Sequence, residues 1–323
     1  MPFCRPTFSV PAVLAALLVP GLLCLAAPAQ AAPNPTAPNP TTPNPSDQEP
    51  LVLAPDQAVE ATINGQSVRL RLAPDGDSGI SLNPEAATRL ALADATGRAE
   101  ARIGPVTVHG RTVVARVTLF GRSGRQRVAW FDRPVAAGFD GEIGPGAIPR
   151  DVVVLRLAEP SADERTVTFR LTARDGQGLG TDIAIGRERV FVSWALDHRE
   201  ARASAATALA LGEVHGGQFV GPVWREPVAF GVERPMRRLA LGEPLVIGAL
   251  RLPAVTVRPW DYGDASGMAV ADAAPQDIVV TAPRPAVKPL HKLTLGQEAL
   301  QGCSSIRFDK ARRALTLSCR TLS

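Results

Sequence analysis

Apolar residues alternate with polar ones in short runs along most of the chain from residue 51 onward. Four of these runs form two pairs, VVVLRL with TVTFRL and SSIRF with ALTLSC, and a few polar residues typical of a turn separate the members of each pair. Because a period of two places successive side chains on opposite faces of a strand, each pair predicts a β-hairpin. The pattern therefore predicts an all-β (mainly β) protein built from many short strands.

One segment of the chain occurs twice. The sequence AATRLAL at residues 86–92 returns as AATALAL at residues 205–211. Each copy follows two alternating runs that are joined at a turn glycine, Gly65 in the first case and Gly186 in the second. The repetition predicts two related β lobes, each with one short helix.

The ends of the two copies also correspond, because an apolar residue followed by glycine occurs in both, as Ile143-Gly144 and Leu295-Gly296. We therefore expect one lobe over residues 51–173 and a second over residues 174–323. The second lobe is longer because it contains residues 263–289, a segment rich in alanine, proline and aspartate that we expect to be a flexible insertion.

The first part of the chain has the pattern of an export signal. Residues 1–31 contain Arg5, an apolar run from Val10 to Ala27 and a small-residue pattern that predicts cleavage after Ala31. The Pro-Asn-Pro repeats of residues 32–50 predict a disordered tether. The sequence thus predicts a periplasmic or secreted protein with no membrane span after signal cleavage, and a retained membrane anchor is the alternative.

Two cysteines, Cys303 and Cys319, remain after the leader is removed, and they lie at the two ends of an alternating segment. In an oxidising compartment this arrangement predicts a disulfide bond, with two free buried thiols as the alternative.

The charge and the scattered histidines exclude several classes of function. The formal charge of +4 comes largely from dispersed arginines, without the basic cluster that binds a nucleic-acid backbone. The four histidines occur singly, and no glycine-rich phosphate loop with a lysine is present. We expect no nucleic-acid partner, no metal and no cofactor.

Two segments resemble the retropepsin-like lobe of aspartic proteases, namely SLNPEAATRLAL at residues 81–92 and LTLGQEALQGCSSIRFDKARRALTL at residues 293–317. The resemblance covers nearly all of the chain apart from the leader, the tether and the insertion, and it implies two pepsin- or retropepsin-like β-barrel lobes. In such proteases each lobe supplies one aspartate, and the two carboxylates share one proton and activate a water molecule.

The resemblance assigns the two aspartates only in part. Counting back from Pro84 puts Pro74 at the first position, so we take Asp77, in the sequence Asp-Ser-Gly, as the first candidate, with Asp75 as its substitute. Asp77 lies three positions later in the chain than the usual spacing of the family. The alternative is that this segment is a solvated acidic turn. In the second lobe the candidate is Asp197, but His198 follows it in place of a hydroxyl residue, so a salt-bridged structural role is the alternative.

The hairpin that covers the substrate in such enzymes corresponds to residues 103–119, which contain no tyrosine. The only tyrosine of the chain, Tyr262, lies in the second half beside Trp260 and Asp261, where we expect a strand end packed on the core and, as an alternative, a lining of the cleft.

A short segment of the insertion, residues 277–283 from Asp277 to Pro283, resembles the TonB box of outer-membrane receptors. Such a segment adds a strand to the sheet edge of its partner. A TonB-like contact and a plain linker strand both remain open.

Three functions are consistent with these observations. The leading hypothesis is an exported aspartic-protease-like protein with degenerate catalytic loops, which binds a peptide or an envelope component in the cleft between the lobes. The alternative is an active aspartic endopeptidase that uses Asp77 and Asp197 with an activated water. The third is a structural envelope protein whose lobes self-associate.

Overall fold

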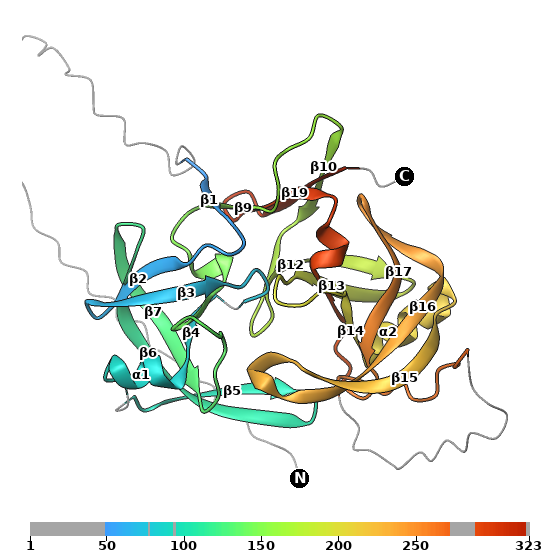
Figure 1. The fold of residues 1–323 in the computed structure, drawn as a ribbon, viewed down its shortest axis with the longest axis horizontal. Coiled ribbons are helices and arrows are strands. Elements are labelled where there is room, and N and C mark those ends of the chain that lie inside the picture. Colours follow the sequence, from blue (N-terminus) through green and yellow to red (C-terminus); the bar gives the residue numbers. More distant parts are fainter. Residues whose placement is uncertain (1–48, 77, 93–94, 272–287, 321–323) are drawn as a thin grey trace, which may run out of the picture. The chain divides into compact units, whose positions relative to one another are not determined.

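The computed structural model describes residues 49–76, 78–92, 95–271 and 288–320, all within one compact unit, Asn44–Ser323. The predicted signal peptide, nearly all of the tether, Asp77, most of the insertion and the TonB-like segment lie outside the described residues. Strands dominate the described residues and the helices are short, which confirms the predicted all-β fold class (Figure 1).

The first sheet has seven strands in the order β2-β3-β8-β4-β7-β6-β5. β2 also pairs with β6, so six of these strands close into a barrel. Alternate side chains of β2 and β3 are buried inside it, as the period of two predicts. The strands are β2 (Val59–Ile63), β3 (Gln66–Leu72), β4 (Ile80–Leu82), β5 (Gly97–Ile103), β6 (Val106–Leu119), β7 (Arg122–Phe131) and β8 (Gly141–Ile143).

The second sheet has eight strands in the order β11-β12-β13-β18-β14-β17-β16-β15. Apart from the additional edge strand β11, it repeats the first sheet strand for strand, and corresponding neighbours pair in the same parallel or antiparallel sense. The strands are β11 (Thr172–Arg174), β12 (Gly178–Ile185), β13 (Glu188–Trp194), β14 (Arg202–Ser204), β15 (Gln218–Pro227), β16 (Glu233–Ile247), β17 (Leu250–Arg258) and β18 (Lys292–Leu295).

One α-helix follows the third strand of each repeat, β4 or β14, in agreement with the repeated segments at residues 86–92 and 205–211. α1 (Pro84–Arg89) begins with a proline at its first position. α2 (Ala205–His215) begins after Ser204, whose hydroxyl accepts the Thr207 N–H, and ends at Gly216 in the left-handed conformation. Within the described residues, no helix has the length and apolar character needed to cross a bilayer.

A third sheet joins strands from both halves of the chain in the order β1-β9-β19-β20-β10. β9 pairs with β19 and β10 pairs with β20, so strands about 150 residues apart lie side by side (Figure 1). The predicted hairpin of VVVLRL with TVTFRL is therefore wrong, because these strands pair with the β19–β20 hairpin and not with each other. The boundaries predicted for the two lobes stay a prediction, because this sheet belongs to both. Its strands are β1 (Leu51–Leu53), β9 (Val152–Arg156), β10 (Glu164–Arg170), β19 (Cys303–Asp309) and β20 (Ala314–Arg320). The described residues also contain short 3-10 helices at η2 (Pro145–Ala147), η3 (Ala229–Gly231) and η4 (Gln297–Leu300).

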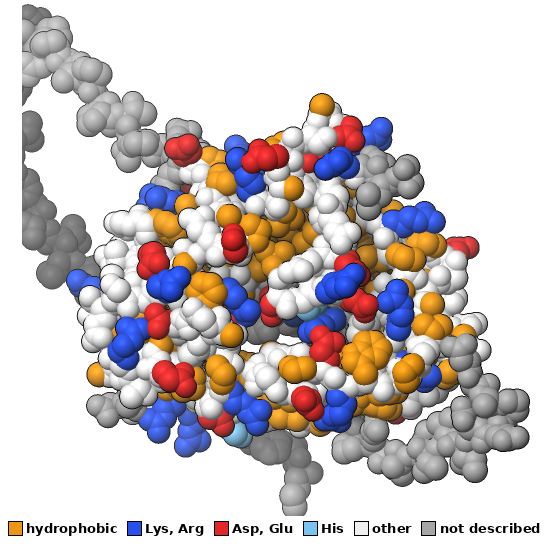
Figure 2. Space-filling model, viewed as in Figure 1, with side chains coloured by type: hydrophobic (Ala, Val, Ile, Leu, Met, Phe, Trp, Pro, Cys, Tyr) orange, Lys and Arg blue, Asp and Glu red, His pale blue; other side chains and the backbone are white. Residues whose placement is uncertain are grey.

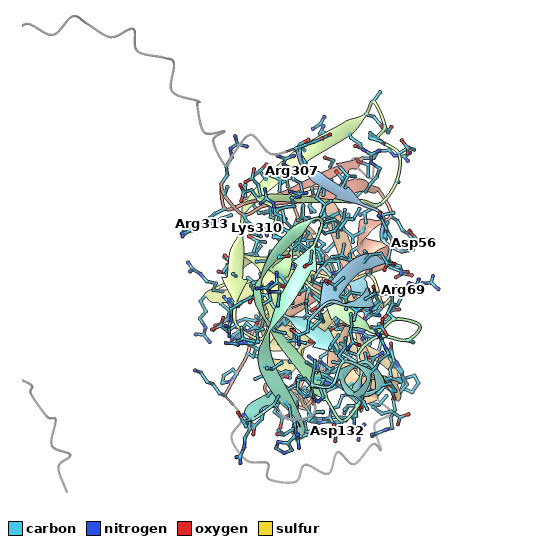
Figure 3. The ribbon with its side chains drawn as sticks, turned by 90° about the vertical axis from the view of Figure 1, so that its left-hand side faces the viewer. Asp56, Arg69, Asp132, Arg307, Lys310 and Arg313 are labelled. Carbon is cyan, nitrogen blue, oxygen red and sulfur yellow. A yellow bond between two sulfur atoms is a disulfide. The ribbon has the colours of Figure 1, made fainter. Side chains whose placement is uncertain are left out.

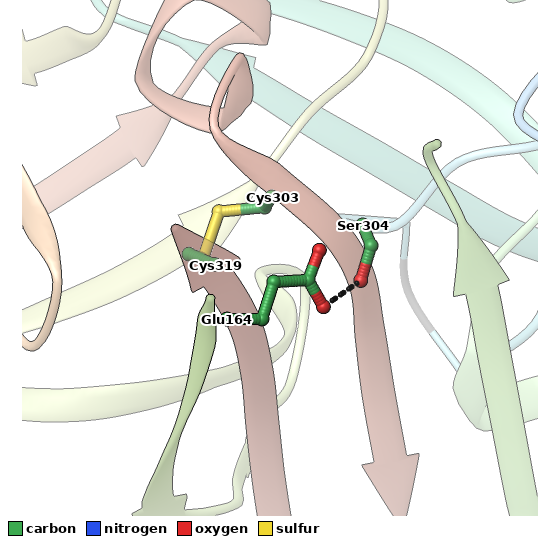
Figure 4. The surroundings of a disulfide bond; sticks show 4 residues. All are labelled: Glu164, Cys303, Ser304 and Cys319. Atoms are coloured by element: carbon green, nitrogen blue, oxygen red, sulfur yellow. Dashed lines mark hydrogen bonds between the residues drawn. A yellow bond between two sulfur atoms is a disulfide. The ribbon is translucent and has the colours of Figure 1, made fainter. Parts of the chain in front are cut away.

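Cys303 and Cys319 form a disulfide bond, as predicted from the sequence (Figure 4). The bond joins directly opposed residues of β19 and β20. Beside it the Ser304 hydroxyl donates a hydrogen bond to the Glu164 carboxylate over 2.7 Å, which connects β19 to β10 (Figure 4). The disulfide and this hydrogen bond hold one end of the third sheet together.

We expect the double substitution Cys303→Ala/Cys319→Ala to lower the free energy of unfolding by about 2–3 kcal/mol, because the bond closes a loop between residues that are 16 positions apart. Urea unfolding of both proteins measures this loss. A reducing agent should destabilise the wild-type protein by the same amount and leave the double variant unchanged. Equal stability of the oxidised wild type and the variant would contradict the prediction.

Candidate functional site

Two acidic loops follow equivalent strands of the two repeats. In the first repeat β3 is parallel to β8, and the Ala73 N–H donates to the carbonyl oxygen of the last residue of β8 over 3.0 Å. In the second repeat β13 is parallel to β18, and the Ala195 N–H donates to the last residue of β18 over 2.9 Å. Asp75 and Asp197 each lie two residues beyond these equivalent hydrogen bonds. The repeated backbone therefore relates Asp197 to Asp75.

Asp77, the candidate taken first from the sequence, lies outside the described residues, and its role stays a prediction. Asp75, its substitute, follows Pro74 in a tight turn closed by a 2.9 Å hydrogen bond from the Gly76 N–H to the Ala73 carbonyl. Pro74 suits the second position of such a turn because its ring fixes φ.

The apolar-glycine pairs found in the sequence lie directly beneath the acidic loops. A Cβ added to Gly76 would lie 3.1 Å from the Cα of Gly144, and one added to Gly296 would lie 2.6 Å from the carbonyl oxygen of Arg199. A Cβ on Gly178, in the segment between the two repeats, would overlap the carbonyl oxygen of Gly76. Glycine is required at these positions because the loop backbone packs there without room for a side chain.

Asp197 is surrounded by cations. The Nδ1 atom of His198 lies 3.0 Å from one of its carboxylate oxygens, and Nη2 of Arg71 lies 3.8 Å from the other. The hydrogen bond from His198 is the main reason that the pKa of Asp197 falls to about 2, and the positive charges of His198, Arg71 and Arg202 add to it. Its side chain is 52% exposed, so this ionised carboxylate is accessible to solvent.

The pKa of Asp75 shifts in the opposite direction to that of Asp197. Burial raises the pKa of its carboxyl group, and the negative charge of Asp197 raises it further. The positive charges of Lys292 and His198 and a hydrogen bond from its own backbone N–H oppose this rise without cancelling it. The ionised Asp197 thus favours the protonated form of Asp75.

A third carboxylate, Glu142, belongs to the same group. Nη2 of Arg71 donates to Oε2 of Glu142 over 2.9 Å and to the carbonyl oxygen of Val135 over 3.2 Å. Burial raises the pKa of Glu142 to about 7, and this effect outweighs the hydrogen bond and the charge of Arg71, while Asp75 and Asp197 raise the pKa further. Glu142 therefore changes its charge near neutral pH.

Arg71 and Glu142 are opposed residues of the parallel pair β3–β8. The corresponding residues of the second repeat are Ser193 and Thr294, whose hydroxyl groups share a hydrogen bond of 3.3 Å. The charged pair is therefore a feature of the first repeat alone.

No sequence pattern predicted Arg71, Glu142 or Lys292 as site residues. Arg71 and Glu142 could have been found as charged residues directly before the two apolar positions that end β3 and β8. Lys292 opens β18 and carries no sequence signal of its own, and its effect on Asp75 depends on contact between the two repeats.

The hairpins at the far end of each sheet contact each other. The β5–β6 hairpin, which includes the predicted covering hairpin, and the β15–β16 hairpin share a small apolar cluster of Ile103, Val108, Phe131 and Val232. The ring centroids of Phe131 and Phe230 lie 4.5 Å apart, edge to face.

Polar contacts reinforce this hairpin pairing. The Tyr262 hydroxyl donates to the Arg102 carbonyl oxygen. Asp261, which is 1% exposed, accepts hydrogen bonds from Nε of Arg234 at 3.1 Å, and a Cβ on Gly104 would overlap its carboxylate. The cluster around Tyr262 thus contacts the β5–β6 hairpin.

Among the residues that the structure describes, no group of three or more histidine, cysteine or acidic side chains is arranged to hold a metal ion.

No protein-family model and no curated protein matches the chain. Among solved structures, an EIAV protease complexed with the inhibitor HBY-793 is 19% identical, with a TM-score of 0.22. The match covers 28% of this chain and 81% of that protease.

We expect Glu142→Gln to change how stability depends on pH. The folded-state pKa of about 7 lies above the ordinary value of 4.5, so native Glu142 binds a proton more tightly than the unfolded chain does. The wild type should therefore lose stability as the pH rises from about 4.5 to 7, by about 3 kcal/mol at most. Glutamine removes this loss, so the variant should be as stable as the wild type near pH 4 and more stable at pH 8.

Urea unfolding at the two pH values checks this expectation, with Glu60→Gln as a control because Glu60 is exposed. A difference between Glu142→Gln and wild type that is the same at both pH values would contradict it.

We expect Gly104→Ala to open the hairpin contact. Gly104 has φ +59°, and an alanine Cβ would displace the Asp261 carboxylate from Arg234. The matched control is Gly121→Ala, since Gly121 has φ +74° and nothing within 4 Å of an added Cβ. Gly121→Ala should lower the free energy of unfolding by about 1 kcal/mol, from backbone strain alone.

Hydrogen exchange of peptides from residues 97–110 measures the opening. Exchange should be faster in Gly104→Ala than in Gly121→Ala. Equal rates in the two variants would show that Asp261 does not hold the hairpin.

Proposed function

We propose that the chain is an exported protein of aspartic-protease-like architecture that binds an extended peptide beside its two acidic loops and does not hydrolyse it. The repeated sheets and the equivalent placement of Asp75 and Asp197 support the architectural part of this proposal. The leader pattern and the disulfide are compatible with export.

The absence of hydrolysis is inferred from one observation: cations surround the carboxylates. His198 and Arg71 hold Asp197 ionised, and Lys292 exerts its charge on Asp75. An aspartic-protease pair needs two carboxylates that share one proton and hold a water molecule between them. The cations beside Asp197 stabilise its ionised form. They therefore oppose the sharing of one proton between Asp75 and Asp197.

A peptide is the ligand that the strand arrangement suits. β5 and β15 are the edge strands of the two repeated sheets. On the outer side of β15, Phe219 already exchanges backbone hydrogen bonds with Ala269 and Ala271, so the free edge of this strand lies beyond Phe219. An extended peptide can pair with such an edge. The exposed carboxylate of Asp197 beside Arg71 offers both an acceptor and donors for backbone amides.

A second function, acid-favoured peptide hydrolysis, is supported by the separation of the two pKa values. With Asp197 ionised and the pKa of Asp75 raised, one carboxylate could act as a base and the other as an acid.

One experiment separates the two functions. The protein is incubated at pH 4 and pH 7 with a pool of random octapeptides, and with a matched pool in which a hydroxyethylene unit replaces the central peptide bond. Retained and cleaved peptides are identified by mass spectrometry. Asp197→Arg should abolish retention by filling the site, while Asp132→Arg, at an exposed residue, should not.

Binding without hydrolysis predicts intact octapeptides, no fragments, and at most about threefold preference for the hydroxyethylene pool. A peptidase would release fragments and bind the hydroxyethylene pool roughly 100-fold more tightly or better, because that unit mimics the transition state. Retention of neither pool would overturn peptide binding at this site.

A further inference from the structure

A groove with a volume of about 1060 Å³ lies where three elements meet, and neither Asp75 nor Asp197 lines it, although Ser78 and Gly146 do. Its walls are the junction of β10 and β11, the β12–β13 hairpin and the turn between β19 and β20. Figure 3 shows two of its lining residues, Lys310 and Arg313, on the same side of the molecule.

The groove has an excess of positive charge. Its two acidic residues already have cationic partners, since Asp182 pairs with Arg174, and Glu188 lies 3.4 Å from Nε2 of His291 and 3.5 Å from Nε of Arg187.

The remaining arginines of the groove have no carboxylate partner among the described residues. Within the described residues no hydrogen bond or ion pair engages the guanidinium groups of Arg170, Arg189 and Arg313. Lys310 donates only to the neutral carbonyl oxygens of Pro145 and Ile148. On the face drawn in Figure 2, by contrast, acidic and basic side chains are interspersed. The groove is therefore suited to a ligand with several negative charges, and planar guanidinium groups bind carboxylates through paired hydrogen bonds.

The backbone of the groove favours a polypeptide over other anions. β10 and β11 are edge strands of their sheets, and Arg170, Thr172 and Ala173 from this stretch line the groove. A strand edge offers amide donors and carbonyl acceptors at the spacing of another extended chain. Leu171 and Leu179 add apolar surface, which suits a peptide whose acidic side chains alternate with apolar ones.

We propose that this groove binds an acidic peptide segment in extended conformation, with its backbone along the edge of β10–β11 and its carboxylates on Arg170, Arg189 and Arg313. This site is distinct from the peptide site proposed at the acidic loops, because neither Asp75 nor Asp197 lines the groove.

The test measures binding of a fluorescent decapeptide of alternating glutamate and valine to the full chain by anisotropy, at 50 mM salt. The groove variant is Arg170→Gln/Arg189→Gln/Arg313→Gln. The matched control is Arg98→Gln/Arg116→Gln/Arg125→Gln, which removes the same charge from exposed positions on β5, β6 and β7. We expect at least tenfold weaker binding in the groove variant, at most twofold in the control, and no change in Asp197→Arg.

The role of the strand edge is tested separately with two peptides, N-methylated at every valine or at every glutamate. Only alternate N–H groups of a strand face its neighbour, so one of these peptides should lose binding and the other should keep it. Equal weakening by the groove and control variants would overturn the proposal, because it would show a general effect of net charge. Equal binding of a polyacrylate of the same charge, or of both methylated peptides, would show an unspecific anion site and also overturn it.

Discussion

The parallel pairing of β3 with β8 and of β13 with β18 determines where the two acidic loops lie. Each pair ends at the same hydrogen bond, and the chain then turns over a glycine that leaves no room for a side chain. The loop backbone is thereby fixed to the sheet from below, so an aspartate two residues later occupies an equivalent place in each repeat. The electrostatics of Asp75 and Asp197 follow from this placement, as do the effects of Lys292 and Arg71.

The two repeats use one backbone for different chemistry. At the same opposed positions the first repeat has Arg71 and Glu142 and the second has Ser193 and Thr294. Only the charged pair reaches across to the other repeat, where Arg71 helps to keep Asp197 ionised. A group of three carboxylates and four cations arises in this way, although duplication alone would have produced a symmetric pair.

The sequence predicted those features of the fold that depend on local patterns. Period-two alternation identified the strands and the β19–β20 hairpin, the repeated AAT segments marked both helices, and the two remaining cysteines identified the disulfide. Alternation did not identify the partners of β9 and β10, because it shows which face of a strand is buried and not which strand lies beside it. The position of the first acidic loop could not be predicted as well. Counting back from Pro84 assumes a fixed number of residues between the loop and the helix, whereas the position of the loop is determined by strand pairing at Ala73. Glu142 and Lys292 could not be found from spacing, since burial and contact between the repeats produce their effects.

The third sheet affects the order in which the polypeptide can reach its final form. Among the described strands β10 has one partner, β20, which follows it by about 150 residues. A ribosome makes β10 well before β20, so β10 remains unpaired until β20 has been made. During that interval the unpaired strand is a target for chaperones or for unwanted association with other chains.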